Sequence, residues 1–591
     1  MKAPLIKLGM VLSALSLSLM PFGVLQAQAE TKTRARVASK SSEKASVSTT
    51  KSDYSSKDIL HLLNRASFGP APGDLERVKA MGVDAYIEQQ LHPQSIQLPQ
   101  KLQEFSKLPA LSETPAKLFL NYGRPALKAI ATKASSDKPE DKKELQKMLK
   151  DTYHKLFEET SSARIERAAL SPAQLQEVMT DFWFNHFNIS IEKNLDHLWV
   201  GSFEEIAIRP NALGKFRDLL GATAHHSAML FYLDNWQNTS PESQMAKFAA
   251  QRGGKNGNRF KGINENYARE LMELHTLGVD GGYSQKDVQE LARVLTGLGL
   301  PPGAGGGFGM RNKGQRRALA GGGLGDAMQM QRPGRAAFQA ASNGDPGTPM
   351  FQGGAGEPLS SDILNNRFGY YFDSRRHDFG EKLIVGHKIA GTGEAEIEQV
   401  LDILAKHPST AKHISYQLAQ YFVSDSPPAS LVDKMAAKFT QTDGDIASVL
   451  NTLFHSSEFW DSKSMNAKFK SPYRYLISTL RATNAEITNV QPSTGVLTQL
   501  GMPLYKCLTP DGYKNTKEAW LNPDNLINRL NFAAAYGTGR FPGIRPSLSD
   551  PSKLADCIGP TLSDKTINAV MESPEGMHVS LLLGSPEFMK Y

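Results

Sequence analysis

The feature that most constrains the fold of this chain is helical periodicity, which recurs from about residue 54 to residue 591. In "SKDILHLLNRASFG" the apolar side chains of Ile59, Leu62 and Leu63 fall on one helical face after a cap at Ser56. The period-2 alternation that indicates strands is scarce, and "EKLIVGHKIAG" is a short candidate hairpin. The pattern predicts a mainly α protein, a large multi-helical domain with few short strands.

Several boundaries follow from capping and breaking residues. Residues 72–93 predict two short helices broken at Gly82. "SPAQLQEVMTDFWFNHFN" predicts a helix with Ser171 as its cap and a Pro at its first position. Residues 134–168 are rich in Glu and Lys at helical spacing, which indicates a solvated helix or hairpin arm. Residues 301–357 are Gly-rich and predict a flexible, disordered insertion.

The N-terminus has the form of an export signal. Residues 1–29 join a basic start, an apolar run and the small residues of "AQA", which ends at Ala29. Residues 30–53 follow as a disordered basic leader rich in Ser, Thr and Lys. We expect cleavage near Ala29, a periplasmic or secreted protein, and no transmembrane helix in the mature chain. An uncleaved membrane anchor is the alternative.

The net charge of +7 does not indicate nucleic-acid binding. Residues 31–51 carry six basic side chains against one acidic, and the Gly-rich insertion carries six against three. The rest of the chain is therefore close to neutral and slightly acidic. A nucleic-acid surface needs its basic residues on the folded body. We therefore expect no nucleic-acid partner.

The chain has two cysteines, Cys507 and Cys557. In an oxidising compartment an even pair most simply forms one disulfide, which would close a loop of about 50 residues. Two unpaired thiols are the alternative. Their separation gives no metal-site spacing.

The most patterned stretch is "GINENYARELMELHTLGVDGGYSQKDVQELARVLTG", residues 262–297. On a helical wheel one polar strip carries Glu265, Arg269, Glu270 and Glu273, with i,i+4 pairs that join Arg269 to both Glu265 and Glu273. His275 lies on the far side from Glu273, so one helix cannot bring both to a metal ion. The strip is either an Arg–carboxylate network on a buried helix or part of a site built around Glu270 or Glu273.

A second helix, in "LQEVMTDFWFNHF", repeats this design. Its polar strip holds Glu177, Asp181, Asn185 and Asn188, whereas His186 falls among apolar residues. A neutral histidine with a hydrogen bond in the core explains His186 as well as a metal ligand does. His186 and His275 are nevertheless placed to converge from two helices.

Two further motifs carry ionisable or polar groups. "MLFYLDNWQN" ends an apolar run with Asp234 and Asn235, which a loop can hold beside a cleft. "RRHDFGEK" contains His377, Asp378 and Lys382; an adjacent His–Asp pair can transfer a proton, bind a metal or simply cap a turn.

These motifs belong to a longer series that occurs in one order along the chain: "HLLNRASFGPAPGDL", "FWFNHFNI", "YLDN", "NENYARELMELHTLGVDGGYSQKDVQELARVLTG", "RRHDFGEK", "HPSTAKHISYQLAQYFVSDSPP" and "LRA". The series resembles the bacterial family known as domain of unknown function 1800 and extends from about residue 57 to residue 591. The resemblance implies an exported, mostly helical protein with no established reaction. Such proteins are often encoded beside a second exported family with a phosphatase-like fold, which suggests a partner. The family's usual Trp after "LTG" is Leu298 here, so any role of that Trp is not carried over.

Ionisable groups inside otherwise apolar helices are costly unless they are paired or used in chemistry. We therefore expect a hydrolase that acts on an extracytoplasmic substrate, with its site where the helices of His186 and Glu273 meet the "HDFGEK" loop. A mixed set of nitrogen and oxygen ligands suits a divalent metal such as Zn or Mn. The alternative is a non-catalytic helical scaffold that binds another exported protein or a surface polymer. The expected roles are catalysis for Glu270, Glu273, His377 and Asp378, binding for Asp234, Asn235, Arg269 and Lys382, and metal ligation for His186 and His275.

Overall fold

Helices build most of the described chain, which in this computed structural model comprises residues 54–123, 139–251, 262–301, 360–547, 551–559 and 562–591. These residues fall in the unit Ser55–Tyr591, apart from Tyr54. The expected signal peptide and leader lie outside the described residues, as does the Gly-rich insertion apart from Pro301.

The N-terminal part consists of short helices. α2 begins at Ser56 with Ser55 as its cap, one residue before the predicted cap, and Ser55 and Asp58 form a capping box. Gly82 separates the next two helices at φ 91°, a conformation open to glycine, which confirms the predicted break. The elements are α2 (Ser56–Ala66), α3 (Asp74–Met81), α4 (Val83–Leu91), η1 (Pro93–Ser95), α5 (Gln100–Glu104), η2 (Phe105–Lys107), α6 (Pro109–Ser112), α7 (Pro115–Leu118) and η3 (Phe119–Gly123).

The central part contains the two polar-striped helices that the sequence singled out. Its elements are α9 (Pro139–Leu170), α10 (Gln174–His186), α11 (Asp196–Ser202), η4 (Phe203–Ile208), η5 (Arg209–Asn211), α12 (Phe216–His225), α13 (Ser227–Tyr232), η6 (Asn235–Gln237), α14 (Gln244–Gln251), α15 (Asn266–Glu273), α16 (Gln285–Val294) and β1 (Leu298–Gly299).

The predicted start of α10 was wrong by two residues. The helix begins at Gln174, and Ser171 does not cap it. The Ser171 Oγ accepts a hydrogen bond from the Ala173 N–H, in the turn before the helix. A residue from α4 does the capping instead: the Gln90 amide donates to the Pro172 carbonyl and accepts from the Leu175 N–H. A cap supplied by another helix cannot be found in the local sequence.

The C-terminal part returns to short helices. Its elements are α18 (Ser361–Asn365), β2 (Tyr371–Phe372), η9 (Ser374–Arg376), β3 (Lys382–Ile384), β4 (His387–Ile389), α19 (Ala395–Lys406), α20 (Pro408–Phe422), α21 (Ala429–Gln441), α22 (Ile446–Phe454), α23 (Ser457–Trp460), α24 (Pro472–Ala482), β5 (Glu486–Ile487), α25 (Gln491–Gln499), α26 (Lys517–Trp520), α27 (Pro523–Gly537), β6 (Ile544–Arg545), α28 (Pro551–Ile558), α29 (Asp564–Met571), η11 (Glu575–Met577) and α30 (His578–Leu583).

The strands of the described residues form three two-stranded antiparallel pairs. β3 and β4 pair with Lys382 opposite Ile389, which confirms the hairpin expected in "EKLIVGHKIAG". β1 pairs with β2 and β5 with β6. With so little sheet, the mainly α class predicted from the sequence is confirmed.

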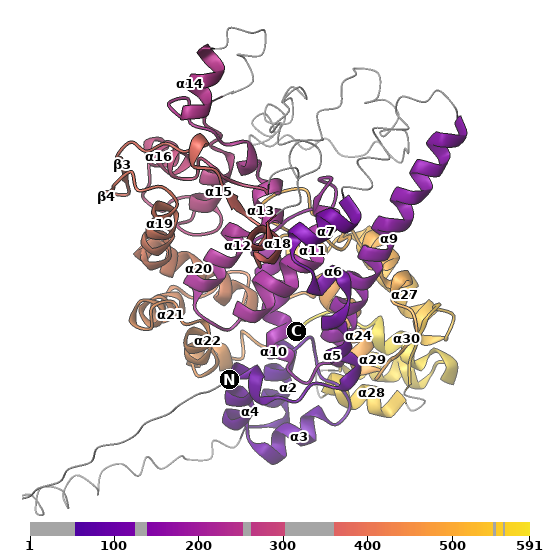
Figure 1. The fold of residues 1–591 in the computed structure, drawn as a ribbon. Coiled ribbons are helices and arrows are strands. Elements are labelled where there is room, and N and C mark those ends of the chain that lie inside the picture. The colour runs from indigo at the N-terminus through magenta and orange to yellow at the C-terminus, as the bar shows by residue number, and fades with distance from the viewer. Residues whose placement is uncertain (1–53, 124–138, 252–261, 302–359, 548–550, 560–561) are drawn as a thin grey trace, which may run out of the picture. The chain divides into compact units, whose positions relative to one another are not determined.

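Helix α10 lies between two groups of helices (Figure 1). Helices α19 to α22 stack one after another on one side, and α27 to α30 gather on the other. Aromatic side chains fill the core around α10; the Trp183 indole N–H donates to the Ala212 carbonyl at 2.9 Å, and Phe187 and Phe216 pack beside it. The polar strip of α10 therefore faces other polar groups within the protein.

The expected disulfide is not formed, and Cys507 and Cys557 are both free thiols. Cys507 lies in a loop that is hydrogen-bonded to α10, beside Phe184 and Tyr513. Cys557 lies on α28, in a different cavity that Ser478 also lines. The fold places the two thiols in separate surroundings. The even number of cysteines therefore did not suffice to predict a disulfide.

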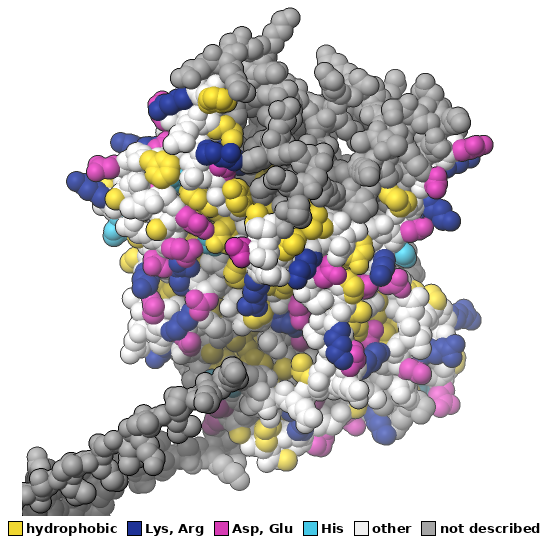
Figure 2. Space-filling model, viewed as in Figure 1, with side chains coloured by type: hydrophobic (Ala, Val, Ile, Leu, Met, Phe, Trp, Pro, Cys, Tyr) yellow, Lys and Arg dark blue, Asp and Glu magenta, His cyan; other side chains and the backbone are white. Residues whose placement is uncertain are grey.

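The face drawn in Figure 2 carries Lys and Arg side chains interspersed with Asp and Glu, without a large area of one sign. This mixture agrees with the near-neutral charge found for the body of the chain. Among the described residues, no helix combines the length and the apolarity needed to cross a membrane.

Candidate active site

Helix α15 is held at its start by two asparagines of the "NEN" motif. Asn264 donates from its side chain to the Asp234 carbonyl, and Asn266 donates to the Leu233 carbonyl, both at 3.1 Å. The Asn264 side chain also accepts from the Asn266 N–H at 3.0 Å. These bonds join the "NEN" motif to the "YLDN" motif, so α15 begins against the turn that follows α13.

Glu270 and Glu273 lie one turn apart on the half-buried face of α15. Burial and, after it, the neighbouring charge of Glu273 raise the pKa of Glu270 to about 7, against the opposing effect of Arg269. Tyr283, from the segment before α16, hydrogen-bonds Glu273 and has a raised pKa because of burial and that carboxylate. The pair therefore combines two nearby carboxyl groups, one of which keeps its proton near neutral pH.

Arg269 does not form the ion pair with Glu273 that the helical wheel suggested. Its guanidinium donates to Glu265 at 3.1 Å and to Gln285 at 3.0 Å. The predicted Glu265–Arg269 pair is thus confirmed, whereas the ion pairs among the described residues include none between Arg269 and Glu273. Gln285 of α16 competes for the guanidinium and draws it away from the site.

A loop from Tyr505 to Tyr513 approaches the same carboxylates from a distant part of the sequence. Its backbone is bound to α10 and to the residues just after this helix. Asn185 of α10 exchanges two hydrogen bonds with Tyr513, and Asn188 donates to the carbonyls of Cys507 and Thr509. Two polar side chains of the predicted strip thus hold the loop. The charge of Asp511, which belongs to this loop, adds to the raised pKa of Glu270.

Gly512 is required where the loop meets α10. Its φ of +66° is strained for other residues, and an added Cβ would lie 2.2 Å from the Asn185 carbonyl oxygen. The close approach fixes the height of the loop above α10 and hence the position of Asp511.

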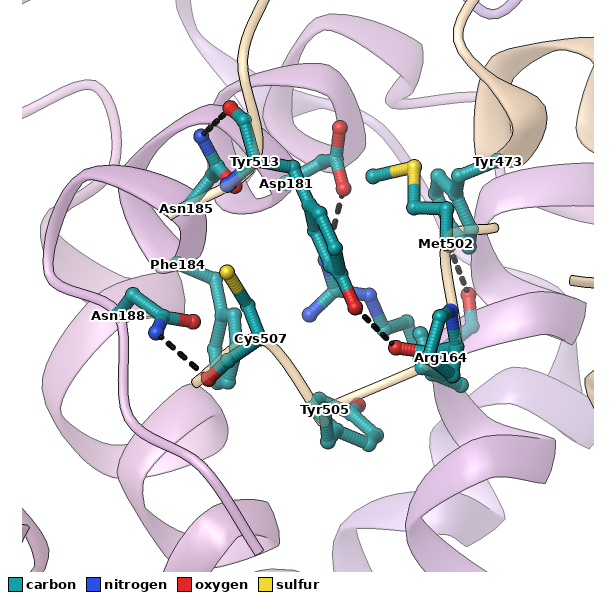
Figure 3. Close-up of a pocket in the computed structure, with 12 residues that line it drawn as sticks. Arg164, Asp181, Phe184, Asn185, Asn188, Tyr473, Met502, Tyr505, Cys507 and Tyr513 are labelled. Carbon is teal, nitrogen blue, oxygen red and sulfur yellow. Dashed lines mark hydrogen bonds and ion pairs between the residues drawn. The ribbon is translucent and has the colours of Figure 1, made fainter. Parts of the chain in front are cut away.

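A cavity is lined by residues of this loop together with side chains of α9 and α10 (Figure 3). Arg164 points into it from α9, bound to Asp181 at 2.7 Å and to Glu204. Its guanidinium lies over the rings of Phe184 and Tyr505. The space between these side chains, about 20 Å³, holds roughly one water molecule. We therefore assign this cavity to the support of the loop and not to a substrate.

Two arginines, Arg164 and Arg167, correct the expectation that residues 134–168 are a solvated segment. The described part of the segment, from Pro139 on, belongs to one long helix, α9, but Arg164 and Arg167 near the end of that helix are buried and not solvated. Arg167 pairs with Glu205 of η4, just as Arg164 pairs with Glu204. Buried charges are tolerated when they are paired in this way.

Asp234 and Asn235 lie beside the start of α15. Asp234 has a left-handed backbone, φ 61°, and its carboxylate binds Lys193 at 2.8 Å. Asn235 is fully buried and donates to the carbonyls of Leu295 and Leu298. Asp234 thus lies beside the helix that carries the two carboxylates, whereas the Asn235 side chain stabilises its own loop through hydrogen bonds to the backbone.

His186 and His275 do converge, with ring centroids 5.9 Å apart, and His413 of α20 joins them at 6.5 Å from His186. The Nε2 atom of His186 is bonded to the His275 carbonyl and that of His413 to the Leu274 carbonyl. These carbonyls end α15 and need donors. Burial is the first cause of a lowered pKa in all three histidines, so they are neutral groups of the core.

The "RRHDFGEK" residues form a separate buried network. His377 is bonded through Nε2 to Glu396 at 3.2 Å, and Lys382 binds the same carboxylate; the three side chains are inaccessible to solvent. Asp378 pairs with Arg293 at 3.0 Å, and hydrogen bonds from Arg293, the Gly380 N–H and Ser240 lower the pKa of Asp378 to about 2 against the effect of burial. We therefore leave His377, Asp378 and Lys382 out of the candidate site.

The described residues do not provide the histidine and carboxylate ligands that were expected for Zn or Mn. Among the described residues, no group of three or more His, Cys, Asp or Glu side chains is arranged to hold a metal ion. The histidine nitrogens that the sequence offered as ligands to Zn or Mn are bonded to backbone carbonyls or, for Nε2 of His275, buried without a partner in the described chain.

Sequence analysis missed Asp511, Tyr283 and Lys193. Asp511 and Lys193 lie in loops without periodicity, and nothing in their local sequence indicates their neighbours. Tyr283 stands just before the capping box of Ser284 and Asp287, a signal that marks the start of α16 but not the partner of the tyrosine.

Comparison with known proteins agrees with the motif series. No curated protein and no solved structure matches the chain. The model of one family, described as a protein of unknown function (DUF1800), matches residues 61–590, nearly the whole chain. The chain belongs to this family of unknown function.

Proposed function

We propose that this protein is a hydrolase in which Glu270 is the general acid and Glu273 the second carboxylate. The observation that supports this most is the pKa of Glu270, raised to about 7 by burial and by Glu273. A catalytic acid works best when its pKa is close to the working pH. Paired carboxyl groups with different protonation states are typical of acid–base hydrolysis.

The bond that suits this pair is a glycosidic bond. Glycosidases use two carboxyl groups, one to protonate the leaving oxygen and one as base or nucleophile. Side chains one turn apart on a helix have Cβ atoms about 5–6 Å apart, close enough to serve one substrate. The nearby thiol of Cys507 is a poor nucleophile, because burial raises its pKa. The proposed substrate is an extracytoplasmic polysaccharide.

We expect Glu270→Gln to lower the rate of polysaccharide hydrolysis on the order of 10²–10⁴-fold, because the amide has no proton to donate to the leaving group. The measurement is the release of reducing ends from a panel of soluble polysaccharides. Activity should fall as the pH rises above about 7, where Glu270 loses its proton. Glu265→Gln is the matched control, since Glu265 stands at the N-cap position of the same helix and binds Arg269.

Two results would contradict this assignment. One is the absence of reducing ends from every polysaccharide of the panel with the wild-type protein. The other is a carboxyl titration of Glu270, followed by NMR of ¹³C-labelled glutamate, with its midpoint near the ordinary value of about 4.3.

A second candidate is the non-catalytic scaffold, whose partner would be a surface polymer or another exported protein, such as one with a phosphatase-like fold. The observation that favours it is that His377, Asp378 and Lys382 are each bound to another side chain of the protein: His377 and Lys382 to Glu396, and Asp378 to Arg293. Retention on an immobilised polysaccharide without hydrolysis, equal for the wild type and Glu270→Gln, would support this candidate.

We also infer that the protein works outside the cytoplasm, from the signal of residues 1–29. N-terminal sequencing of the protein expressed in a bacterial host is expected to begin at Glu30. Ala29→Arg should leave a longer precursor, because the cleavage site requires small residues. A wild-type chain that still begins at Met1 would contradict export by cleavage.

A further inference from the structure

A second cavity, of about 490 Å³, lies beside the first turn of α10. Its walls come from the end of α4 and from η1, from η5 and the residues after it, and from the start of α22. Small-molecule sites have volumes of about 300–1,000 Å³, so this cavity is large enough for a ligand, whereas the cavity of Figure 3 is not. Gln176 lines it, about 14 Å along α10 from Asn185, which holds the loop of Asp511. The cavity is therefore separate from the proposed active site.

Backbone hydrogen bonds join two walls of this cavity. The Phe216 N–H donates to the Gly444 carbonyl at 2.8 Å, and the Ile446 N–H donates to the Gly214 carbonyl at 3.0 Å. These bonds connect the segment after η5 to the start of α22, and Gly214 and Asp445, one from each side, both line the cavity. The shape of the cavity is thus built into the fold, as is usual for small-molecule sites.

The charged side chains of the walls already have partners within the protein. Arg209 is bound by three glutamates. Glu88 binds His92 at 2.9 Å, and the Asp445 carboxylate accepts a hydrogen bond from the Ser448 N–H at the start of α22. The described lining residues therefore hold no unpaired cation for a phosphate or carboxylate ligand, and an anionic ligand is disfavoured.

The amide side chains of the walls, in contrast, are available to a ligand. Gln94, Gln176 and Asn451 line the cavity, and their side-chain amides have no hydrogen bond to another described residue. Gln90 and Gln174, which lie close to them in sequence, bind backbone groups within the protein. Each amide offers both donors and an acceptor. The unused hydrogen-bonding capacity of the cavity is thus neutral and of both kinds.

Apolar side chains complete the lining, namely Leu91, Pro93, Pro210 and Leu213. A sugar ring suits such a mixture, because its hydroxyl groups both donate and accept hydrogen bonds while its C–H groups form apolar patches. A peptide of similar size would bring larger apolar side chains, and no Phe, Tyr or Trp is among the described lining residues to receive them. The lining therefore favours a saccharide over a peptide.

We propose that this cavity is a binding site for a neutral oligosaccharide, held by the side-chain amides of Gln94, Gln176 and Asn451. The site uses neither Glu270 nor Glu273, so it holds its ligand whether or not the protein hydrolyses it. Its role is to retain one segment of a polysaccharide on the protein.

The test is isothermal titration calorimetry of the purified full chain with neutral tetrasaccharides derived from cellulose, chitin, xylan and starch. Ligand concentrations up to about 10 mM reveal Kd values in the millimolar range. The Glu270→Gln variant is titrated in parallel, so that hydrolysis cannot consume the ligand. At least one tetrasaccharide should bind to both proteins. Gln94→Ala combined with Asn451→Ala should weaken this binding by about 4–100-fold, because each lost hydrogen bond between neutral groups is worth about 2–10-fold.

Gln100→Ala combined with Asn568→Ala is the matched control, since both residues are exposed and lie outside the cavity. This pair should keep the wild-type affinity. Tetragalacturonate should bind more weakly than the neutral sugars, because no unpaired cation lines the site. The proposal is overturned if no neutral tetrasaccharide binds, if the cavity variant binds as tightly as the wild type, or if tetragalacturonate or a capped tetra-alanine peptide binds more tightly than every neutral sugar.

Discussion

Glu396→Ala is expected to lower the free energy of unfolding by about 3–5 kcal/mol, because it leaves the Lys382 ammonium buried without its counterion. Both side chains are inaccessible to solvent. Burial alone would raise the pKa of Glu396, but hydrogen bonds from His377, Lys382 and the Gly393 N–H hold it below its ordinary value, so the carboxylate is charged. The measurement is guanidinium-induced unfolding followed by tryptophan fluorescence.

The control lies on the same helix. Glu398 binds Arg217, but its side chain is 54% exposed, so Glu398→Ala should cost less than about 1 kcal/mol. Replacing both buried partners, with Lys382→Met and Glu396→Met together, should recover much of the stability lost by the single change, since apolar pairs of similar volume often substitute for buried ions. A loss below 1 kcal/mol for Glu396→Ala would show that Lys382 finds another partner.

This network also marks the limit of prediction from the sequence. "RRHDFGEK" drew attention to His377 and Lys382 because ionisable groups adjoin a glycine. Their common partner, Glu396, lies in the first turn of α19, where acidic residues are ordinary. The sequence could not distinguish a buried counterion from a solvated one, so a stabilising network was interpreted as a catalytic group.

Helices could be predicted well because their signals are local. The break at Gly82 and the β3–β4 hairpin each depend on a few neighbouring residues. The start of α10 was misplaced because its cap, Gln90, comes from α4. In the same way the Arg269 guanidinium donates to Gln285 of α16 and not to Glu273 of its own helix. Local rules fail where a residue of another element competes for the same bond.

The candidate site shows the same division. Glu270 and Glu273 could be selected from their positions on one polar strip. The polar strip of α10 was also recognised, but not its purpose: Asn185 binds Tyr513, 328 residues away in the sequence. That contact places Asp511 near Glu270. The pKa of Glu270 thus depends on tertiary contacts that no periodicity encodes.

The pH dependence of stability should be steep on the acid side. Burial lowers the pKa of His61, His186 and His226 to about 3 and that of His275 well below its ordinary value. The unfolded chain, whose histidines titrate near 6.5, then binds protons that the folded chain does not. The stability these groups retain above pH 6.5 is therefore lost as the pH falls from about 6.5 toward 3.

Two carboxyl groups act in the opposite direction. Glu270 and Asp196 have raised pKa values in the folded protein, the first about 7, so they hold protons that the unfolded chain releases. At about pH 5.5 unfolding should therefore take up protons, because the buried histidines with lowered pKa values outnumber these two carboxyl groups. The free energy of unfolding should therefore fall as the pH is lowered below about 6.5, by about 1.4 kcal/mol per pH unit for each proton that unfolding takes up. Urea unfolding at a series of pH values measures this slope.

His226 offers the sharpest test of the assignment. Its Nδ1 atom accepts from the Ala228 N–H and caps α13, while Nε2 lies 3.2 Å from the Ser202 hydroxyl. His226→Asn keeps an acceptor for the cap but cannot titrate, so it should reduce proton uptake by about one and flatten the slope by about 1.4 kcal/mol per pH unit. His154→Asn, at an exposed position of α9, should leave the slope unchanged. Equal slopes for the wild type and His226→Asn would mean that His226 takes up its proton within the folded protein, and the buried histidines would then not be the origin of acid instability.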